Sequence, residues 1–143
     1  MKRRLPLLIF FAILALLAYA FLAPHPMFKG SEPCKVQYIL YNPDYNCTET
    51  INLTDFDSDA VIACLQKYKA ENSLTLASAD SYSEIILELL VSQGDDFKTI
   101  GLGKRNYICS AQENNHRSFL YRIKQGEDLR DEILQILNLP PVT

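Results

Sequence analysis

The chain has 143 residues, of which 48% are hydrophobic, and it carries a formal net charge of −3. This composition argues against collagen, a coiled coil, a disordered chain and a basic nucleic-acid-binding protein. The averages pool two different parts, because residues 1–23 contain 19 of the 69 hydrophobic residues and three basic ones, whereas the other 120 residues have a net charge of −6. Those 120 residues suffice for one hydrophobic core.

The N-terminal segment, residues 1–23, begins with three basic residues and continues with an uncharged apolar run over residues 5–23. A helix of 19 such residues is about 28 Å long, which is close to the ~30 Å hydrocarbon core of a bilayer. Basic residues that precede a spanning helix favour the cytoplasmic side. The sequence therefore predicts a single-pass helix in the cell membrane, with the N-terminus cytoplasmic and the C-terminal domain outside.

The same segment has two interpretations. It is either a signal-anchor that stays attached or a signal peptide that is removed, because Ala18 and Ala20 form the small-x-small pattern of a signal-peptidase site. The apolar run extends beyond this site, which favours the anchor, but the residues leave both interpretations open. Residues 24–33 then contain three prolines and one glycine, which predicts a Pro-rich spacer between membrane and domain.

The next elements are predicted to be a β-hairpin and a helix. Residues 35–41 are rich in β-branched and aromatic side chains, residues 47–53 alternate between two faces, and turn residues separate them. Apolar residues at helical spacing then predict an amphipathic helix over residues 58–70. The acidic stretch at residues 54–59 supplies oxygen atoms that cap the first N–H groups of such a helix.

The second half of the domain is predicted to be a four-stranded antiparallel meander followed by a helix. Residues 72–83 are polar and small, which predicts a loop or a weak edge strand. Residues 85–91 are largely apolar on both faces, as expected of a central strand. Turn residues separate the later elements, which are strands at residues 97–102, 107–110 and 118–124 and an amphipathic helix between Gly126 and Pro140.

These elements follow the order β-β-α-β-β-β-β-α. Such an order predicts the α+β class, with one antiparallel sheet of about six strands and the two amphipathic helices on one face. The predicted extracytoplasmic domain covers residues 34–139, and residues 140–143 form a short tail.

The layout consists of a basic start, an apolar segment, a hairpin ending in Leu-Thr-Asp at residues 53–55, a helix, a meander and a closing Glu-Asp-Leu-x-x-x-Ile-Leu helix at residues 127–134. This layout resembles that of small membrane-anchored extracytoplasmic proteins of unknown function from Gram-positive bacteria. The resemblance covers residues 35–137 and is one of pattern. It implies a fold and a location, and it provides no catalytic residue.

Four cysteines in an extracytoplasmic domain suggest two disulfide bonds. Cys34 and Cys47 flank the predicted hairpin, and Cys64 faces inward from the predicted helix toward the strand that carries Cys109. We therefore expect Cys34 to pair with Cys47 and Cys64 with Cys109. The alternative is that some of the four are free thiols that act as small apolar core residues.

An acidic motif precedes the first domain helix. Asp55, Asp57 and Asp59 resemble the start of a calcium-binding loop. The glycine and the glutamate that such a loop needs are replaced by Ala60 and Gln66. We therefore interpret the acidic residues as a helix cap.

The remaining motifs have equally simple interpretations. Residues 101–104 resemble part of a phosphate loop, but a tight β-turn explains them. His116 lies in a polar turn, and we interpret it as a solvated residue. Asn46 and Asn52 begin glycosylation sequons, which have meaning only if the source is eukaryotic. The sequence thus predicts no catalytic residue, no metal site and no cofactor.

Charge is unevenly distributed along the domain. Residues 44–96 carry 11 acidic and two basic side chains, whereas residues 97–124 carry six basic and one acidic. The basic strands either attract an anionic surface, such as lipid headgroups or an envelope polymer, or compensate the acidic half internally. The candidate residues for an anionic surface are Lys104, Arg105, Arg117, Arg122 and Lys124.

The sequence as a whole predicts a membrane-anchored binding or interaction module of the cell envelope rather than an enzyme. Its expected partners are the membrane, through residues 5–23, and an envelope polymer or another envelope protein, but not nucleic acid. The alternative is a cleaved, secreted protein that acts as a small enzyme or as an enzyme inhibitor. No residue pattern identifies a ligand.

Overall fold

The computed structural model describes the backbone of residues 4–28, 30, 34–43, 49–72, 84–104, 107–113 and 117–142. Side chains are described for these residues except 4, 5, 107–113 and 117–120. The elements in chain order are α1 (Arg4–Leu22), β1 (His25–Pro26), β2 (Cys34–Tyr41), β3 (Ile51–Leu53), α2 (Ser58–Lys67), β4 (Lys69–Asn72), β5 (Ile85–Gln93), β6 (Asp96–Gly103), β7 (Tyr107–Glu113), β8 (Arg117–Ile123) and α3 (Gly126–Ile136).

The described strands form one antiparallel sheet with the order β1-β4-β8-β7-β6-β5-β2-β3. The predicted α+β class is confirmed, and so are the hairpin of β2 with β3 and the meander from β5 to β8. The sheet has eight described strands rather than about six, because β1 and β4 are short strands that the sequence pattern does not indicate. The helix predicted over residues 58–70 ends earlier, since Tyr68 has an extended backbone and β4 follows it.

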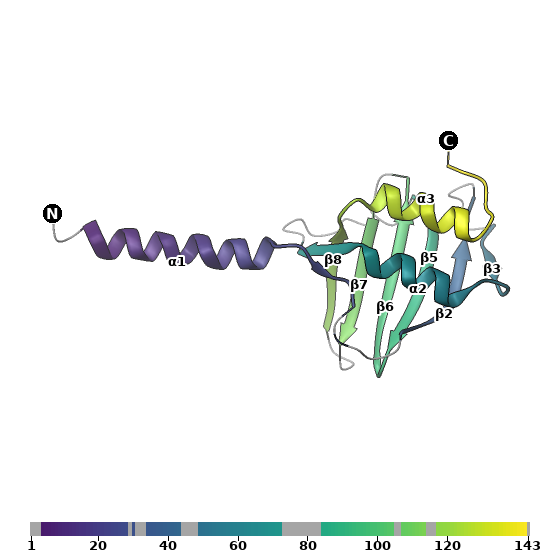
Figure 1. The fold of residues 1–143 in the computed structure, drawn as a ribbon, viewed down its shortest axis with the longest axis horizontal. Coiled ribbons are helices and arrows are strands. Elements are labelled where there is room, and N and C mark those ends of the chain that lie inside the picture. Colours follow the sequence, from purple (N-terminus) through teal and green to yellow (C-terminus); the bar gives the residue numbers. More distant parts are fainter. Residues whose placement is uncertain are drawn as a thin grey trace.

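Helices α2 and α3 lie side by side on one face of the sheet, as predicted (Figure 1). The core between the two layers follows from the alternation of strand residues, because Leu87, Leu89 and Val91 of β5 are all fully buried. The helices add apolar residues at helical spacing. These are Val61, Cys64 and Leu65 from α2, and Leu129, Ile133 and Leu134 from α3.

The start of α2 confirms the interpretation of the acidic stretch as a helix cap. Asp57 is the N-cap residue, and its Oδ1 accepts hydrogen bonds from the backbone N–H groups of Asp59 and Ala60, each at 3.0 Å. These bonds satisfy two donors that have no partner within the helix. The cap therefore accounts for Asp57 without a bound cation.

Helix α1 projects away from the sheet and from the other two helices (Figure 1). It has 19 residues by its backbone, and 17 of them, from Pro6 to Leu22, have described side chains. Among all the residues that the structure describes, no helix has both the length and the apolar character needed to cross a membrane. The membrane helix that the sequence predicts at residues 5–23 stays a prediction.

Candidate functional site

A short segment at the β1 edge of the sheet joins α1 to the domain. We call residues His25–Phe28 the strap. Its first two residues form β1, with His25 opposite Ala70 and Pro26 opposite Lys69 in β4. Met27 and Phe28 then enter the core, where they are 3% and 8% exposed. The prediction of residues 24–33 as a spacer is therefore wrong for the strap, because these residues pair with the sheet and pack into the core.

Two contacts fix the point where the strap meets α1. The side-chain amide of Asn72 in β4 donates a hydrogen bond to the carbonyl oxygen of Phe21, at 2.5 Å. The ring of His25 packs edge-to-face on the ring of Tyr121 in β8, with 5.1 Å between the ring centroids. Only Ala23 and Pro24 lie between α1 and β1, so the helix continues almost directly into the edge of the sheet.

Lys98 of β6 holds the far end of the strap. Its Nζ donates a hydrogen bond to the carbonyl oxygen of Met27. The same nitrogen lies 5.0 Å from the centroid of the Phe28 ring, which is the geometry of a cation–π contact. One partly buried cation therefore fixes both the backbone and the aromatic side chain of the strap.

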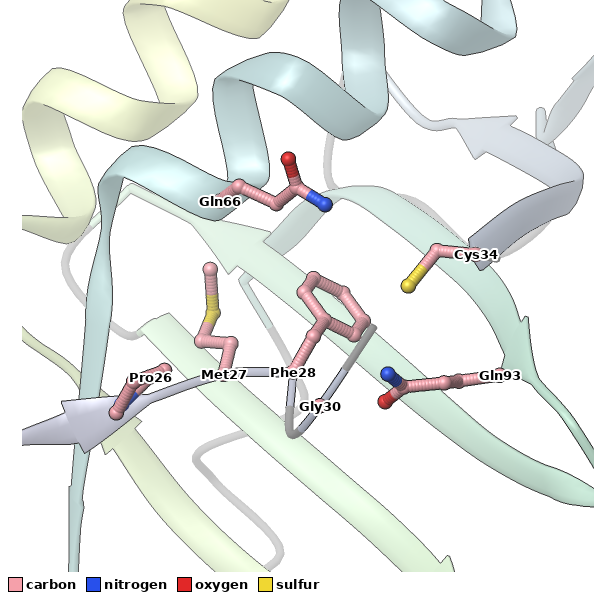
Figure 2. A pocket seen from close by; sticks show the side chains of 7 residues that line it. All are labelled: Pro26, Met27, Phe28, Gly30, Cys34, Gln66 and Gln93. Atoms are coloured by element: carbon pink, nitrogen blue, oxygen red, sulfur yellow. The ribbon is translucent and has the colours of Figure 1, made fainter. Parts of the chain in front are cut away.

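A cavity of about 170 Å³ adjoins this contact. Figure 2 shows the ring of Phe28 between Gln66 of α2 and Gln93 of β5, with the thiol of Cys34 directed toward it. The cavity has amide donors and acceptors, one thiol and one aromatic ring, and its volume suits water or a small polar molecule. Its lining residues are Pro26, Met27, Phe28, Gly30, Cys34, Gln66 and Gln93.

The thiol in this cavity is poorly suited to nucleophilic catalysis. Burial raises the pKa of Cys34, and the positive charge of Lys98 offsets only part of that rise. The thiolate is the nucleophilic form of cysteine, and reactive cysteines have a lowered pKa. The electrostatics at Cys34 therefore favour the neutral thiol.

No protein family, no curated protein and no solved structure matches this chain.

A second cluster of titratable side chains joins α2 to α3. Glu132 of α3 accepts hydrogen bonds from Lys67 and from Tyr68, the latter at 3.1 Å. The buried thiol of Cys64 also hydrogen-bonds to Glu132, and burial together with this carboxylate raises the pKa of Cys64 to about 12. The hydrogen bond from Lys67 contributes most to lowering the pKa of Glu132, and burial and Glu132 raise the pKa of Tyr68. The cluster acts as a polar link between two helices.

The cysteines differ in part from the predicted disulfide pattern. Cys64 has a free, buried thiol rather than a bond to Cys109, so it matches the alternative in which cysteine acts as a small core residue. Cys109 lies in β7, and its side chain is outside the described residues. Cys34 likewise has a thiol rather than the predicted disulfide bond to Cys47, which is itself outside the described residues.

Arg130 of α3 is a buried cation with several partners. It is 5% exposed, and its guanidinium donates to the carbonyl oxygens of Gly103 and Lys104 at 3.3 and 3.2 Å. It also pairs with Asp131 at 2.7 Å. These bonds attach α3 to the end of β6, so the charge of Arg130 is used within the fold.

The structure separates the predicted anionic-surface residues into groups. Arg122 and Lys124 lie at the end of β8 and are exposed. Lys104 follows β6, which ends at the same end of the sheet because β7 runs antiparallel to both strands. Arg117 begins β8 at the opposite end, and its side chain is outside the described residues, as is the whole of Arg105.

Other predicted positions have clear places in the fold. Ala18 and Ala20, the candidate signal-peptidase residues, both lie within α1. Asn52 is exposed in β3, whereas Asn46 is outside the described residues. Among described residues, no group of three or more His, Cys, Asp or Glu side chains is placed to bind a metal ion.

Gly101 and Gly103 lie in strand β6, so the tight turn predicted for residues 101–104 is wrong at these two glycines. A Cβ atom at Gly101 would be 2.8 Å from Cδ1 of Ile85, so the glycine provides room for that side chain. His116 is outside the described residues.

Sequence reasoning missed the residues around the strap. Met27 and Phe28 are two adjacent large apolar residues in a Pro-rich stretch, and this pair was an available signal of burial. The partners Lys98 and Gln93 carried no such signal, because their positions near the strap depend on strand pairings that bring together residues about 70 positions apart.

Proposed function

We propose that the chain is an extracytoplasmic interaction module that α1 holds in the cell membrane. The observation that carries this proposal is the exposure of large apolar side chains on every side of α1. Twelve such residues between Leu7 and Leu22 are 42% to 75% exposed. Because they are nearly consecutive, they leave no polar face on the helix. The residues are Leu7, Leu8, Ile9, Phe10, Phe11, Ile13, Leu14, Leu16, Leu17, Tyr19, Phe21 and Leu22.

The energetics of α1 favour an apolar environment. Complete burial of a large apolar side chain is worth about 1.5 to 3 kcal/mol, so removing the exposed half of these twelve from water is worth about 10 to 20 kcal/mol. A soluble domain rarely exposes a continuous apolar surface of this kind. The 17 described residues of α1 fall at the lower limit of about 17 to 25 residues for a spanning helix, and Arg4 and Leu5 extend its backbone.

The same proposal accounts for the domain. The titratable groups of α2 and α3 pair with one another inside the domain. Cys34 in the cavity and Cys64 in the cluster around Glu132 both have a raised pKa. We therefore propose binding or scaffolding rather than catalysis. The expected orientation keeps the basic N-terminus in the cytoplasm and the domain outside. The resemblance to small extracytoplasmic proteins of Gram-positive bacteria is part of this proposal and supports the same location.

Fractionation of cells that express the full chain tests the anchor. We expect the protein in the membrane pellet after alkaline carbonate extraction. Arginine costs about 3 kcal/mol at the centre of a spanning helix, so Ile13→Arg with Leu17→Arg offsets about 6 kcal/mol of the insertion energy. This double variant is expected to shift from the pellet toward the supernatant.

The matched control replaces two exposed apolar residues of the domain. Ile51 and Phe97 are 50% and 44% exposed, and the pair Ile51→Arg with Phe97→Arg should stay in the pellet. Wild-type protein in the carbonate supernatant, or equal behaviour of the two double variants, would contradict the membrane anchor. A protein found only in the medium, shortened by cleavage after Ala20, would instead establish the secreted alternative.

A further inference from the structure

The strap sets how far the domain lies from the end of α1. Between Leu22 and His25 the chain takes three steps, which span at most about 11 Å. The headgroup layer on one side of a bilayer is about 7 Å thick. An α1 helix in the membrane therefore places the β1–β4–β8 edge of the sheet directly at the headgroups, with no length of spacer to hold it away.

Three exposed cations gather at this edge. Ala70 in β4 is buried in the core, so its neighbour Lys69 points to the opposite face of the sheet, away from α2 and α3. Arg122 is opposite Glu71 in the pairing of β8 with β4. The backbone N–H of Lys124 donates to the carbonyl oxygen of Lys69 at 2.9 Å, so these two residues are adjacent.

These cations differ from Lys67, Lys98 and Arg130, whose charged groups have partners within the fold. Lys67 pairs with Glu132, Lys98 donates to the strap, and Arg130 is buried against carbonyl groups and Asp131. In the described part of the chain, no carboxylate lies within ion-pair distance of Lys69, Arg122 or Lys124. Together with Glu71, these three cations carry a net charge of +2.

We infer that Lys69, Arg122 and Lys124 bind anionic phospholipid headgroups and hold the domain against the bilayer in one orientation. The inference rests on the proposed membrane anchor and adds a second point of contact to it. Each Lys or Arg near an anionic membrane strengthens its attraction about fivefold, and the anchor keeps the three cations within reach of the surface. Lys69 extends the set of cations that the sequence indicated, because it comes from the acidic half of the chain.

Lysine acetylation of the full chain in nanodiscs tests the contact. The rate of modification of each lysine is measured by mass spectrometry in discs of phosphatidylcholine alone and in discs that also contain phosphatidylglycerol. We expect Lys69 and Lys124 to react several-fold more slowly in the anionic discs, and added salt to abolish the difference. Lys35 is the internal control, because it is exposed and lies in β2, near the other edge of the sheet.

The variant Arg122→Gln tests the contribution of one cation to the contact. Arg122→Gln should weaken the contact about fivefold and reduce the protection of both lysines. Equal rates at Lys69 and Lys124 in the two kinds of disc would overturn the inference, and so would equal protection of Lys35. A chain that does not enter the discs at all would overturn the membrane anchor and this inference together, whereas incorporation without protection overturns the inference alone.

Discussion

Replacement of Phe28 by alanine tests whether the strap is a structural part of the domain. Phe28 is only 8% exposed, and truncation to alanine removes about 100 Å² of buried apolar area, or about 2.5 kcal/mol at 25 cal/mol per Å². Loss of the contact between the ring and Lys98 adds about 0.5 kcal/mol. We therefore expect Phe28→Ala to lower the free energy of unfolding by about 3 kcal/mol.

The matched control for this substitution is Phe97→Ala. Phe97 is also a phenylalanine, but it is 44% exposed in β6, so its truncation should lower the free energy of unfolding by less than about 1 kcal/mol. The assay is thermal unfolding of the full chain in nanodiscs, followed by near-ultraviolet circular dichroism. A loss of 3 kcal/mol corresponds to a fall of about 12 °C in the midpoint for a domain of this size.

If Phe28→Ala and Phe97→Ala unfold within about 2 °C of each other, the Phe28 ring does not contribute to the core, and the strap is the spacer that the Pro-rich composition predicts. A large fall in the unfolding midpoint for Phe28→Ala, together with a small fall for Phe97→Ala, confirms that the strap and the rest of the domain unfold together.

Two further substitutions probe the helices. Glu132→Gln weakens the link from Glu132 to Lys67 and Tyr68. The pKa of Glu132 is lowered in the folded state. The contribution of Glu132 to stability is therefore present above its unfolded pKa of about 4.3 and is lost as pH falls through the folded value. The difference in unfolding free energy between wild type and Glu132→Gln, measured by urea titration, should be constant at neutral pH and should shrink under acid conditions; a difference that grows as pH falls contradicts this. Asp57→Ala removes the N-cap of α2 and should lower the unfolding free energy by about 1 kcal/mol at pH 7, whereas Asp57→Asn, which keeps a capping oxygen, should lower it by less; equal losses in the two variants would show that the cap does not stabilise α2.

The elements that the sequence predicted well are those with local signals. Apolar periodicity located α2 and α3, and turn residues separated β5, β6, β7 and β8. Helix α1 has the position of the predicted apolar segment. These elements depend on residues that are close together in the chain, so single-sequence patterns suffice to find them.

The parts that the sequence missed depend on distant partners. Strand β1 has only two residues, and it becomes a strand because β4 supplies a partner 45 positions away, with His25 opposite Ala70. Prolines favour linkers in general, but Pro26 is tolerated here because it belongs to an edge strand. The cavity has the same origin, since Phe28, Gln66 and Gln93 come from three segments that only the folded sheet and α2 bring together.

The position of β1 also has a consequence for the order of events during synthesis. Its partner β4 is paired in turn with β8, which ends at Ile123, so the first residues after α1 join a part of the sheet that is completed late in the chain. Until Lys98 and β8 have left the ribosome, Met27 and Phe28 have no completed core to enter. Such pairing between distant segments is slow to form. The earliest part of the domain to be made is therefore among the last to reach its final place.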